Sequence, residues 1–543
     1  MKRPTLRLET LVLIVAAYAV VCGNWGWWSG VLAGRATTDP NSWGFALGVA
    51  VLLIAIQYVL FLLPSTRLTV RPWLITCLLV TMATQYYIVS YRVLIDPAMI
   101  QNVLHTDARE ASELIGWRPM LWTLVPALPA IALVLSTRLR TVSFGAALRW
   151  RALTSVAALL LAAVAVLAIN RDFTSLMRNE RGLRYLVTPA NVLHGVVRNA
   201  FFASNTTPTL RARIGDDARQ MAHGPATARP RIVVLVVGET ARAANFSLLG
   251  YQRNTNPNLA KRNVVAFKDV VACGTSTEIS VPCMFSPFGR ADYDERRIRE
   301  SEGLLDVLVK AGVQVIWREN QSGCKGVCVN PMVGLQVMQE QSTSPFCNTG
   351  PCPDEVLLEK LDEVMAAATG DLVIVLHQLG QHGPAYFERY PPRLRVFEPT
   401  CDTSELRRCS QQEVINTYDN GILYTDEVLA KLVDLLAAGN ARFDSAMLYL
   451  SDHGELLGES GLYLHGMPYA FAPRVQLQIP MIFWSSPQFQ QRTSLDLDCL
   501  KRRAEQPASH DNLFHSMLGL LDIETNEYQP DRDLFAGCRA TAA

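Results

Sequence analysis

Acidic and imidazole side chains in this sequence gather directly after apolar, β-branched runs. Five of them follow three such runs: Glu239 after Ile232–Val237, His377 and His382 after Leu372–Leu376, and Asp452 and His453 after Ala446–Leu450. The carboxyl ends of parallel strands lie at one edge of a sheet, so these groups should share a rim. Carboxylates with neutral imidazoles suit zinc or manganese, and the sequence therefore predicts a metal site there.

A segment rich in hydroxyl groups is the second chemical feature. Thr275, Ser276 and Thr277 lie together just before a short helical stretch. A hydroxyl at a helix N-terminus sits among free backbone N–H groups, which suit a phosphate. Such a hydroxyl becomes a useful nucleophile when a metal or a base activates it. The spacing leaves all three hydroxyls open, and a plain Ser/Thr helix cap is the alternative.

Alternating strand and helix signals must position these groups. Further buried-strand runs lie at Val313–Trp317 and Ile479–Trp484. Helix-length segments lie between the runs, at Gly303–Ala311, Glu355–Ala368 and Glu413–Ala438. Strands that alternate with helices indicate an α/β domain with a mainly parallel sheet, which we expect to occupy residues 231–543.

The first 170 residues are dominated by apolar stretches. Five of them are long enough to cross a bilayer, which takes about 20 residues each: Leu11–Leu32, Gly44–Leu63, Pro72–Val93, Pro119–Thr137 and Ala152–Ile169. A cleaved signal peptide is the alternative for the first, but its apolar run continues past the cleavage-like Ala17–Ala19. We predict a five-helix transmembrane domain at 1–170 and an interfacial helix with a linker at 171–230.

Basic residues in the loops predict the orientation of the chain. Lysine and arginine precede the first span, and arginines occupy the loops after the second and fourth spans. Such loops stay in the cytoplasm, so five spans place the N-terminus there and residues after 170 across the membrane. The formal net charge of +1 argues against a nucleic-acid partner.

Cysteine usage agrees with a translocated domain. Ten of the 12 cysteines lie after Val271, many in close pairs, which favours disulfides in an oxidising compartment. Sequence proximity suggests four pairs and leaves a fifth by elimination: Cys273–Cys283, Cys324–Cys328, Cys347–Cys352, Cys401–Cys409 and Cys499–Cys538. The alternative is a finger-like metal site at the second and third pairs.

Six ordered motifs carry a resemblance to a known family. They are Gly238–Arg242, Cys273–Thr277, Ser280–Phe285, Cys324–Cys328, His382–Tyr386 and Ser451–Glu455. Together they resemble the lipid A phosphoethanolamine transferases, a family that includes the mobile colistin-resistance enzymes. The likeness covers essentially the whole chain, including the five spans and Asp511–His515.

The resemblance implies an alkaline-phosphatase/sulfatase-like fold for the periplasmic domain and zinc as its cofactor. The implied zinc ligands are Glu239, Thr277, Asp452 and His453, and the implied nucleophile is Thr277. This choice goes beyond the spacing, which does not separate Thr277 from its two neighbours.

The resemblance also implies residues that contact the substrate. His382 and His465 would contact the transferred phosphate or a second, looser zinc. Lys325 would neutralise phosphate charge, although a solvated lysine in a disulfide loop is an equally good interpretation.

One segment between the third and fourth spans also resembles the family. The spacing of Asn102, Thr106 and Glu110 predicts that they lie near one helix face on the translocated side. They would hold an ethanolamine head group, with Glu110 facing the ammonium. A capped interfacial helix is the alternative.

The implied reaction moves phosphoethanolamine from phosphatidylethanolamine to lipid A through a phosphoethanolamine–threonine intermediate. The product would carry less negative surface charge, which implies resistance to polymyxin and colistin. Transfer to core sugars of lipopolysaccharide and a related membrane phosphoglycerol transferase are the alternatives. We expect a monomeric, multi-pass protein of the inner membrane that contacts membrane lipids and has a periplasmic catalytic domain.

Overall fold

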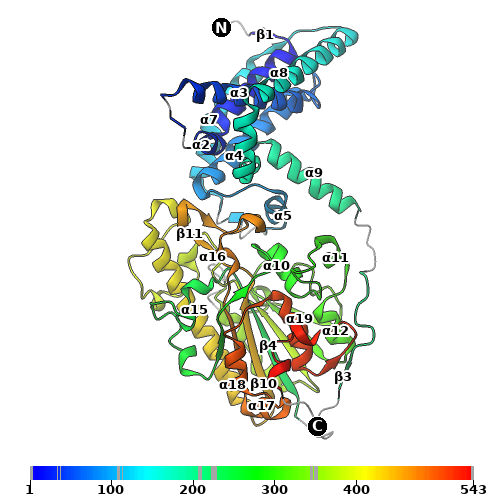
Figure 1. Cartoon of the computed structure of the whole chain (residues 1–543), viewed down its shortest axis with the longest axis vertical. Coiled ribbons are helices and arrows are strands. Elements are labelled where there is room, and N and C mark those ends of the chain that lie inside the picture. The colour runs from blue at the N-terminus through cyan, green and yellow to red at the C-terminus, as the bar shows by residue number, and fades with distance from the viewer. Residues whose placement is uncertain are drawn as a thin grey trace. The chain divides into compact units, whose positions relative to one another are not determined.

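The chain folds into two compact units, residues Met1–Asn205 and Thr206–Ala543 (Figure 1). The computed structural model describes residues 4–33, 35–36, 38–106, 111–112, 114–205, 211–221, 229–342, 347 and 352–539. The first unit is helical, and the second is built around a twisted sheet.

Long apolar helices make up the first unit. Their bounds are α1 Leu8–Gly23, α2 Trp25–Val31, α3 Pro40–Leu62, α4 Val70–Tyr91, α7 Trp117–Ser136 and α8 Phe144–Asn179. Among the described residues, four helices are long and apolar enough to cross a membrane, and α1 with α2 makes a fifth if that bent pair is one span. The described helices therefore give the predicted five spans only if α1 and α2 together form one of them.

The first span differs from its prediction, because α1 and α2 meet at Asn24 with a bend of 65°. The buried Asn24 side chain donates to the carbonyls of Ala19, 2.7 Å away, and Thr188, 3.1 Å away. It also accepts a 2.8 Å hydrogen bond from the Thr188 backbone N–H. Thr188, which is distant in sequence, thus forms hydrogen bonds with Asn24 at the break. Local hydropathy does not predict such a contact.

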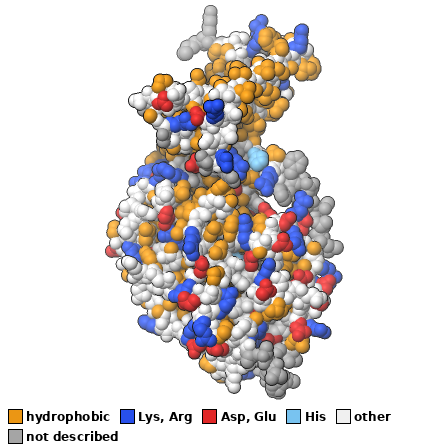
Figure 2. All heavy atoms as spheres, in the orientation of Figure 1, with side chains coloured by type: hydrophobic (Ala, Val, Ile, Leu, Met, Phe, Trp, Pro, Cys, Tyr) orange, Lys and Arg blue, Asp and Glu red, His pale blue; other side chains and the backbone are white. Residues whose placement is uncertain are grey.

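Many hydrophobic side chains are exposed on the surface of the helical unit (Figure 2). Exposed side chains there include Leu47, Leu121, Val125, Leu160 and Leu167. Soluble proteins rarely expose contiguous apolar surface on this scale, whereas lipid-facing helices do so by necessity.

The predicted interfacial segment, 171–230, divides between the two units. Helix α8 runs past residue 170 to Asn179, and η1 (Arg181–Leu186) and α9 (Ala190–Asn205) complete the first unit. Strand β3 (Arg219–Gln220) belongs to the second unit, where it pairs with β15 (Ile523–Glu524).

The second unit contains a seven-stranded sheet within the described residues. Its order is β5 (Val265–Phe267), β13 (Met481–Ser485), β10 (Asp444–Ser451), β4 (Arg231–Gly238), β9 (Leu372–His377), β7 (Gln314–Glu319) and β8 (Val333–Val337). The pairs from β10 to β8 are parallel, while β13 is antiparallel to both of its neighbours. The predicted, mainly parallel sheet is confirmed.

Helices cover both faces of this sheet (Figure 1). On β4, Val233, Leu235 and Val237 face α10 (Thr277–Met284), α12 (Leu304–Lys310) and α19 (Leu513–Leu520). The alternate residues Ile232, Val234 and Val236 face α14 (Leu361–Ala366) and α15 (Gln411–Ala438). Burial on both faces explains why β4 is a continuous apolar run.

One predicted helix is broken. The segment Glu355–Ala368 forms η6 (Asp354–Leu358) and then α14, with Lys360 between them in the left-handed region at φ 52°. The buried Arg318 guanidinium donates to the carbonyls of Leu357 and Glu359, each at 2.8 Å. Those carbonyls would otherwise accept hydrogen bonds inside a continuous helix.

The remaining α-helices and strands of the second unit are short. They are β6 (Val270–Val271), α11 (Glu295–Glu300), α13 (Met338–Gln341), β11 (Leu456–Leu457), β12 (Tyr463–Leu464), α16 (Arg474–Leu477), α17 (Pro487–Thr493), α18 (Leu497–Arg503) and β14 (Ala508–Ser509).

Five disulfides join the ten cysteines of the second unit. The pairs are Cys273–Cys283, Cys324–Cys328, Cys347–Cys352 and Cys401–Cys409, which sequence proximity suggested, and Cys499–Cys538, which was left by elimination. In the part of the chain that the structure describes, Cys22 and Cys77 are the free thiols.

We predict that alkylation of the denatured, unreduced protein labels Cys22 and Cys77 alone. Reduction before labelling should raise the number of labelled cysteines to 12. Each bridge typically contributes about 2–4 kcal/mol, so reduced protein should also melt at a lower temperature. Peptide mapping checks the assignment, and a labelled thiol among the other ten before reduction would contradict it.

Candidate metal and nucleophile site

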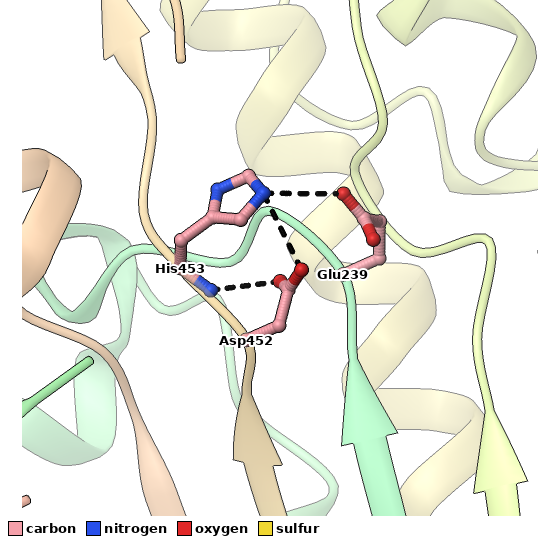
Figure 3. Close-up of side chains that lie close together, drawn as sticks. All are labelled: Glu239, Asp452 and His453. Carbon is pink, nitrogen blue, oxygen red and sulfur yellow. Dashed lines mark hydrogen bonds and ion pairs between the residues drawn. The ribbon is translucent and has the colours of Figure 1, made fainter. Parts of the chain in front are cut away.

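Three buried side chains converge at the carboxyl ends of β4 and β10 (Figure 3). Glu239 follows β4, and Asp452 and His453 follow β10, its parallel neighbour. His453 Nε2 lies 3.3 Å from Asp452 Oδ2 and 3.6 Å from Glu239 Oε1. One ligand atom from each residue lies within 4.8 Å of the others, so the group could hold a metal ion.

Local hydrogen bonds leave two of these ligand atoms without partners. Asp452 Oδ1 accepts from the backbone N–H of Thr240 at 3.0 Å and of His453 at 2.7 Å. His453 Nδ1 lies 2.8 Å from the Gly454 carbonyl, to which it donates, so Nε2 is left as an acceptor. Among the described residues, Asp452 Oδ2 and His453 Nε2 have no hydrogen-bond partner. Buried, unpaired acceptors that face each other fit a cation.

Burial also sets the protonation of the group. It raises the pKa of Glu239 and of Asp452, and the Asp452 charge raises that of Glu239 further. Burial lowers the pKa of His453 to about 4, which keeps the imidazole neutral at physiological pH. Two buried carboxylates beside a neutral imidazole form a negative site when ionised, and a divalent cation would neutralise it.

Thr277 is the hydroxyl residue that joins this group. It is the first residue of α10, and its Oγ1 donates to Glu239 Oε2 at 3.0 Å. Thr275 Oγ1 instead donates to the Met467 carbonyl at 2.7 Å, away from the carboxylates. Ser276 Oγ is buried and has no partner among the described residues. The geometry thus distinguishes three hydroxyls that the spacing left equivalent.

A second network fixes α10 to the strand that carries Asp452. Ser280 Oγ donates to the Asp452 carbonyl at 2.5 Å and accepts from the Gly274 N–H at 3.2 Å. His510 Nδ1 accepts from the Cys273 N–H at 3.0 Å, and its Nε2 lies 2.9 Å from the Ser451 carbonyl. The sequence analysis did not assign a role to Ser280 or His510, because each acts through the backbone of a distant segment.

His382 and His465 lie beside the three converging residues. The His465 ring is 4.4 Å from the His453 ring and 5.7 Å from the His382 ring, centroid to centroid. His465 Nδ1 lies 3.2 Å from Glu455 Oε2, which also accepts from the Tyr386 hydroxyl at 2.9 Å. The sequence analysis assigned Glu455 no role, although this residue is the last of the Ser451–Glu455 motif.

Glu455 gives the site a predicted pH response. Burial raises its pKa from 4.5 to about 7, so between these values the folded protein keeps a proton that the unfolded chain has lost. The free energy of unfolding should therefore fall as pH rises through this window, by up to about 3 kcal/mol.

We expect Glu455→Gln to reduce that loss. Melting temperatures of wild type and Glu455→Gln, measured with a chelator from pH 5 to pH 8, should diverge in favour of the variant as pH rises. Parallel curves would show that Glu455 does not contribute.

His377 does not join the metal-binding group. Its Nδ1 lies 2.9 Å from Glu319 Oε2, an oxygen that also accepts from Trp317 Nε1 at 2.8 Å. The metal-binding group found among the described residues contains Glu239, Asp452 and His453 but not His377. His377 lies at the carboxyl end of β9, as expected, but Glu319 on the neighbouring strand β7 holds its ring.

Lys325 lies in the Cys324–Cys328 loop at a left-handed φ of 51°. Its ammonium donates to Ser322, to Oγ at 2.7 Å and to the carbonyl at 3.1 Å. Within the described residues, no hydrogen bond of Lys325 reaches Thr277, so its contact with phosphate stays a prediction.

Asn102 and Thr106 do not both lie within a helix. Helix α5 spans Pro97–His105, and Thr106 already has extended backbone. Thr106 Oγ1 donates to the Asn102 carbonyl at 2.8 Å, which closes the end of α5. Glu110 lies outside the described residues. The prediction that Asn102 and Thr106 share a face of one helix is therefore wrong.

Comparisons with known proteins identify the family. Residues 231–523 match the sulfatase family, and residues 53–201 match the family described as phosphoethanolamine transferase EptA/EptB. Phosphoethanolamine transferase EptA of Escherichia coli (strain K12) is 39% identical over 99% of this chain and 98% of its own length. The chain belongs to the phosphoethanolamine transferase family.

Two further members support this conclusion. Phosphatidylethanolamine transferase Mcr-1 of Escherichia coli is 37% identical over 91% of both chains. The solved structure of the integral membrane protein lipooligosaccharide phosphoethanolamine transferase A from Neisseria meningitidis is 35% identical, with a TM-score of 0.93 over 99% of this chain and 100% of that one.

Membership confirms three expectations from the sequence. The protein is a transferase, its second unit has the sulfatase/alkaline-phosphatase-like fold, and it is a multi-pass membrane protein. The match to the EptA/EptB family, residues 53–201, lies within the first unit.

Proposed function

We propose that this transferase moves phosphoethanolamine from phosphatidylethanolamine to lipid A, with Thr277 as the nucleophile. The observation that carries the proposal is the 3.0 Å hydrogen bond from Thr277 Oγ1 to Glu239 inside a buried group of metal-ligand type. The names of the relatives, which include phosphoethanolamine transferases and a Kdo(2)-lipid A phosphoethanolamine transferase of Escherichia coli, support the choice of substrates.

Zinc is the proposed cofactor. Glu239, Asp452 and His453 would hold it together with Thr277, because imidazole nitrogen and carboxylate oxygen are common zinc ligands. When bound, zinc supplies Lewis acidity that lowers the pKa of a hydroxyl and polarises a phosphoryl oxygen.

The residues of the chain perform the transfer in two steps. Glu239 orients the Thr277 hydroxyl, whose oxygen attacks phosphorus, and diacylglycerol leaves with the proton. A phosphate or hydroxyl oxygen of the acceptor then attacks phosphorus, the bond from phosphorus to Thr277 Oγ1 breaks, and Thr277 regains a proton from the acceptor. Orientation and charge neutralisation by His382, His465 and Lys325 would supply much of the rate, as in other phosphoryl transfers.

The location of the substrates explains the architecture. Donor and acceptor are both lipids, so a soluble domain tethered to membrane helices meets them at the bilayer. We propose an inner-membrane protein with a cytoplasmic N-terminus and a periplasmic catalytic domain, which the loop arginines and five disulfides support. Asn102, Thr106 and Glu110 remain candidates for the ethanolamine head group.

Expression in a polymyxin-sensitive strain tests the function. Mass spectrometry of lipid A should show added phosphoethanolamine, and the strain should gain resistance because its surface carries less negative charge. Unmodified lipid A together with modified core sugars would show that the core sugars of lipopolysaccharide are the acceptor. In vitro, activity with phosphatidylglycerol in place of phosphatidylethanolamine would identify a phosphoglycerol transferase instead.

A further inference from the structure

The turn that carries Glu239 contains a backbone conformation that its sequence disfavours. Thr240 is buried and has φ 57°, in the left-handed region. A β-branched residue rarely adopts this region, because its Cβ substituents crowd the backbone. Such a conformation persists only where the surroundings impose it, and it is common at functional sites.

Hydrogen bonds from two other elements impose this conformation. The Tyr418 hydroxyl, from α15, donates to the Thr240 carbonyl at 2.7 Å and accepts from the Arg242 N–H at 3.0 Å. Ser451 Oγ, at the end of β10, accepts from the Ala241 N–H at 2.8 Å. One tyrosine therefore holds the turn on both sides of Ala241.

The held turn acts on both carboxylates of the candidate metal site. The Thr240 hydroxyl donates to Glu239 Oε1 at 2.5 Å, while Thr277 takes the other oxygen, Oε2. The Thr240 N–H donates to Asp452 Oδ1, which turns Oδ2 toward His453. With the turn in another conformation, both of these contacts of Thr240 would be lost.

We propose that Tyr418 and Thr240 are positioning residues, which hold the Glu239 turn so that Glu239 and Asp452 bind the metal. The proposal rests on the proposed metal site and goes beyond it, since neither residue is a ligand. Tyr418 stabilises the backbone of the turn. Thr240 orients the two carboxylates, through its hydrogen bonds to Glu239 and Asp452. Partners that orient metal ligands typically change metal affinity by about 10–100-fold when they are removed.

The test compares three tyrosine and threonine variants of the full chain in detergent. Zinc affinity, measured by competition with a chromogenic chelator, should fall about 10–100-fold in Tyr418→Phe. Thr240→Val should show a similar fall, because it keeps the branched shape but removes the hydroxyl. Thr240→Ser keeps the hydroxyl and should recover most of the affinity.

Tyr449→Phe is the matched control. Tyr449 is fully buried on β10, and its hydroxyl has no hydrogen-bond partner among the described residues. Its removal should leave zinc affinity within about twofold of wild type. Melting temperatures with chelator present show whether a variant has lost stability rather than metal-site geometry.

The outcomes separate the two proposals. Wild-type zinc affinity in both Tyr418→Phe and Thr240→Val would overturn the positioning role. Wild-type affinity in Glu239→Ala would instead overturn the metal site itself. If Tyr418→Phe does not fold, the Thr240→Val and Thr240→Ser pair decides the question, because it changes a single side chain inside the turn.

Discussion

Replacing Thr277 with alanine should abolish phosphoethanolamine transfer, with a fall in turnover of at least about 10³-fold. Thr277 is the residue whose hydroxyl donates to Glu239 Oε2, while Oε1 accepts from Thr240, and alanine at position 277 leaves no atom to attack phosphorus. Thr277→Ser should keep a fraction of the activity, because serine retains the hydroxyl but lacks the methyl group that restricts its rotamer. Release of diacylglycerol from labelled phosphatidylethanolamine measures the effect.

The neighbouring hydroxyls supply the controls for this prediction. Thr275→Ser and Ser276→Ala should keep measurable turnover, since Thr275 donates to the Met467 carbonyl and Ser276 has no partner among the described residues. A Thr277→Ala enzyme that still releases diacylglycerol at a tenth of the wild-type rate would exclude Thr277 as the nucleophile.

The second large effect concerns the carboxylates. Glu239→Ala and Asp452→Ala should each lose bound zinc and transfer activity together. A tight tetrahedral site needs about four donors, and each substitution removes one that no described neighbour replaces. Metal content of the purified protein by mass spectrometry, together with the lipid transfer assay, measures both consequences.

Asp426→Asn is the control for removal of a buried carboxylate. Asp426 lies in the interior on α15, where it accepts from the N–H groups of Asn258 and Leu259, at 2.8 and 3.0 Å. Its variant should retain zinc, even if it melts at a lower temperature. Full zinc occupancy in Glu239→Ala would remove Glu239 from the ligand set.

Much of the catalytic fold was predictable, because strands that are buried on both faces of a sheet form continuous apolar runs in the sequence. The runs at Ile232–Val237 and Leu372–Leu376 each match a central strand within one residue at either end. The edge strands β5 and β8 are short or partly exposed, so their sequences carry no such run. The antiparallel direction of β13 depends on its connection to β10, which local sequence does not specify.

The candidate site was predictable where a residue follows directly after a strand. Glu239, Asp452 and His453 do so, and the ends of β4 and β10 bring them together. His377 follows the same rule but turns to Glu319, since a carboxylate on the adjacent strand captures its ring. The role of Tyr418 was not predictable, because it stands 178 residues from its partner Thr240.

The membrane unit shows a similar limit. Hydropathy identifies apolar length, but it does not locate breaks that depend on distant partners, such as Asn24 with Thr188. The spacing of Asn102 and Thr106 likewise suggested a longer helix than α5, which ends where the Thr106 hydroxyl donates to the Asn102 carbonyl.

The most direct test of the account is a search for the covalent intermediate. Wild-type protein incubated with phosphatidylethanolamine and no acceptor should release diacylglycerol and gain one phosphoethanolamine. Peptide mapping by mass spectrometry should place that group on Thr277, and addition of lipid A should remove it. An adduct on another residue, or transfer to lipid A with no adduct at any time, would contradict a two-step reaction through Thr277.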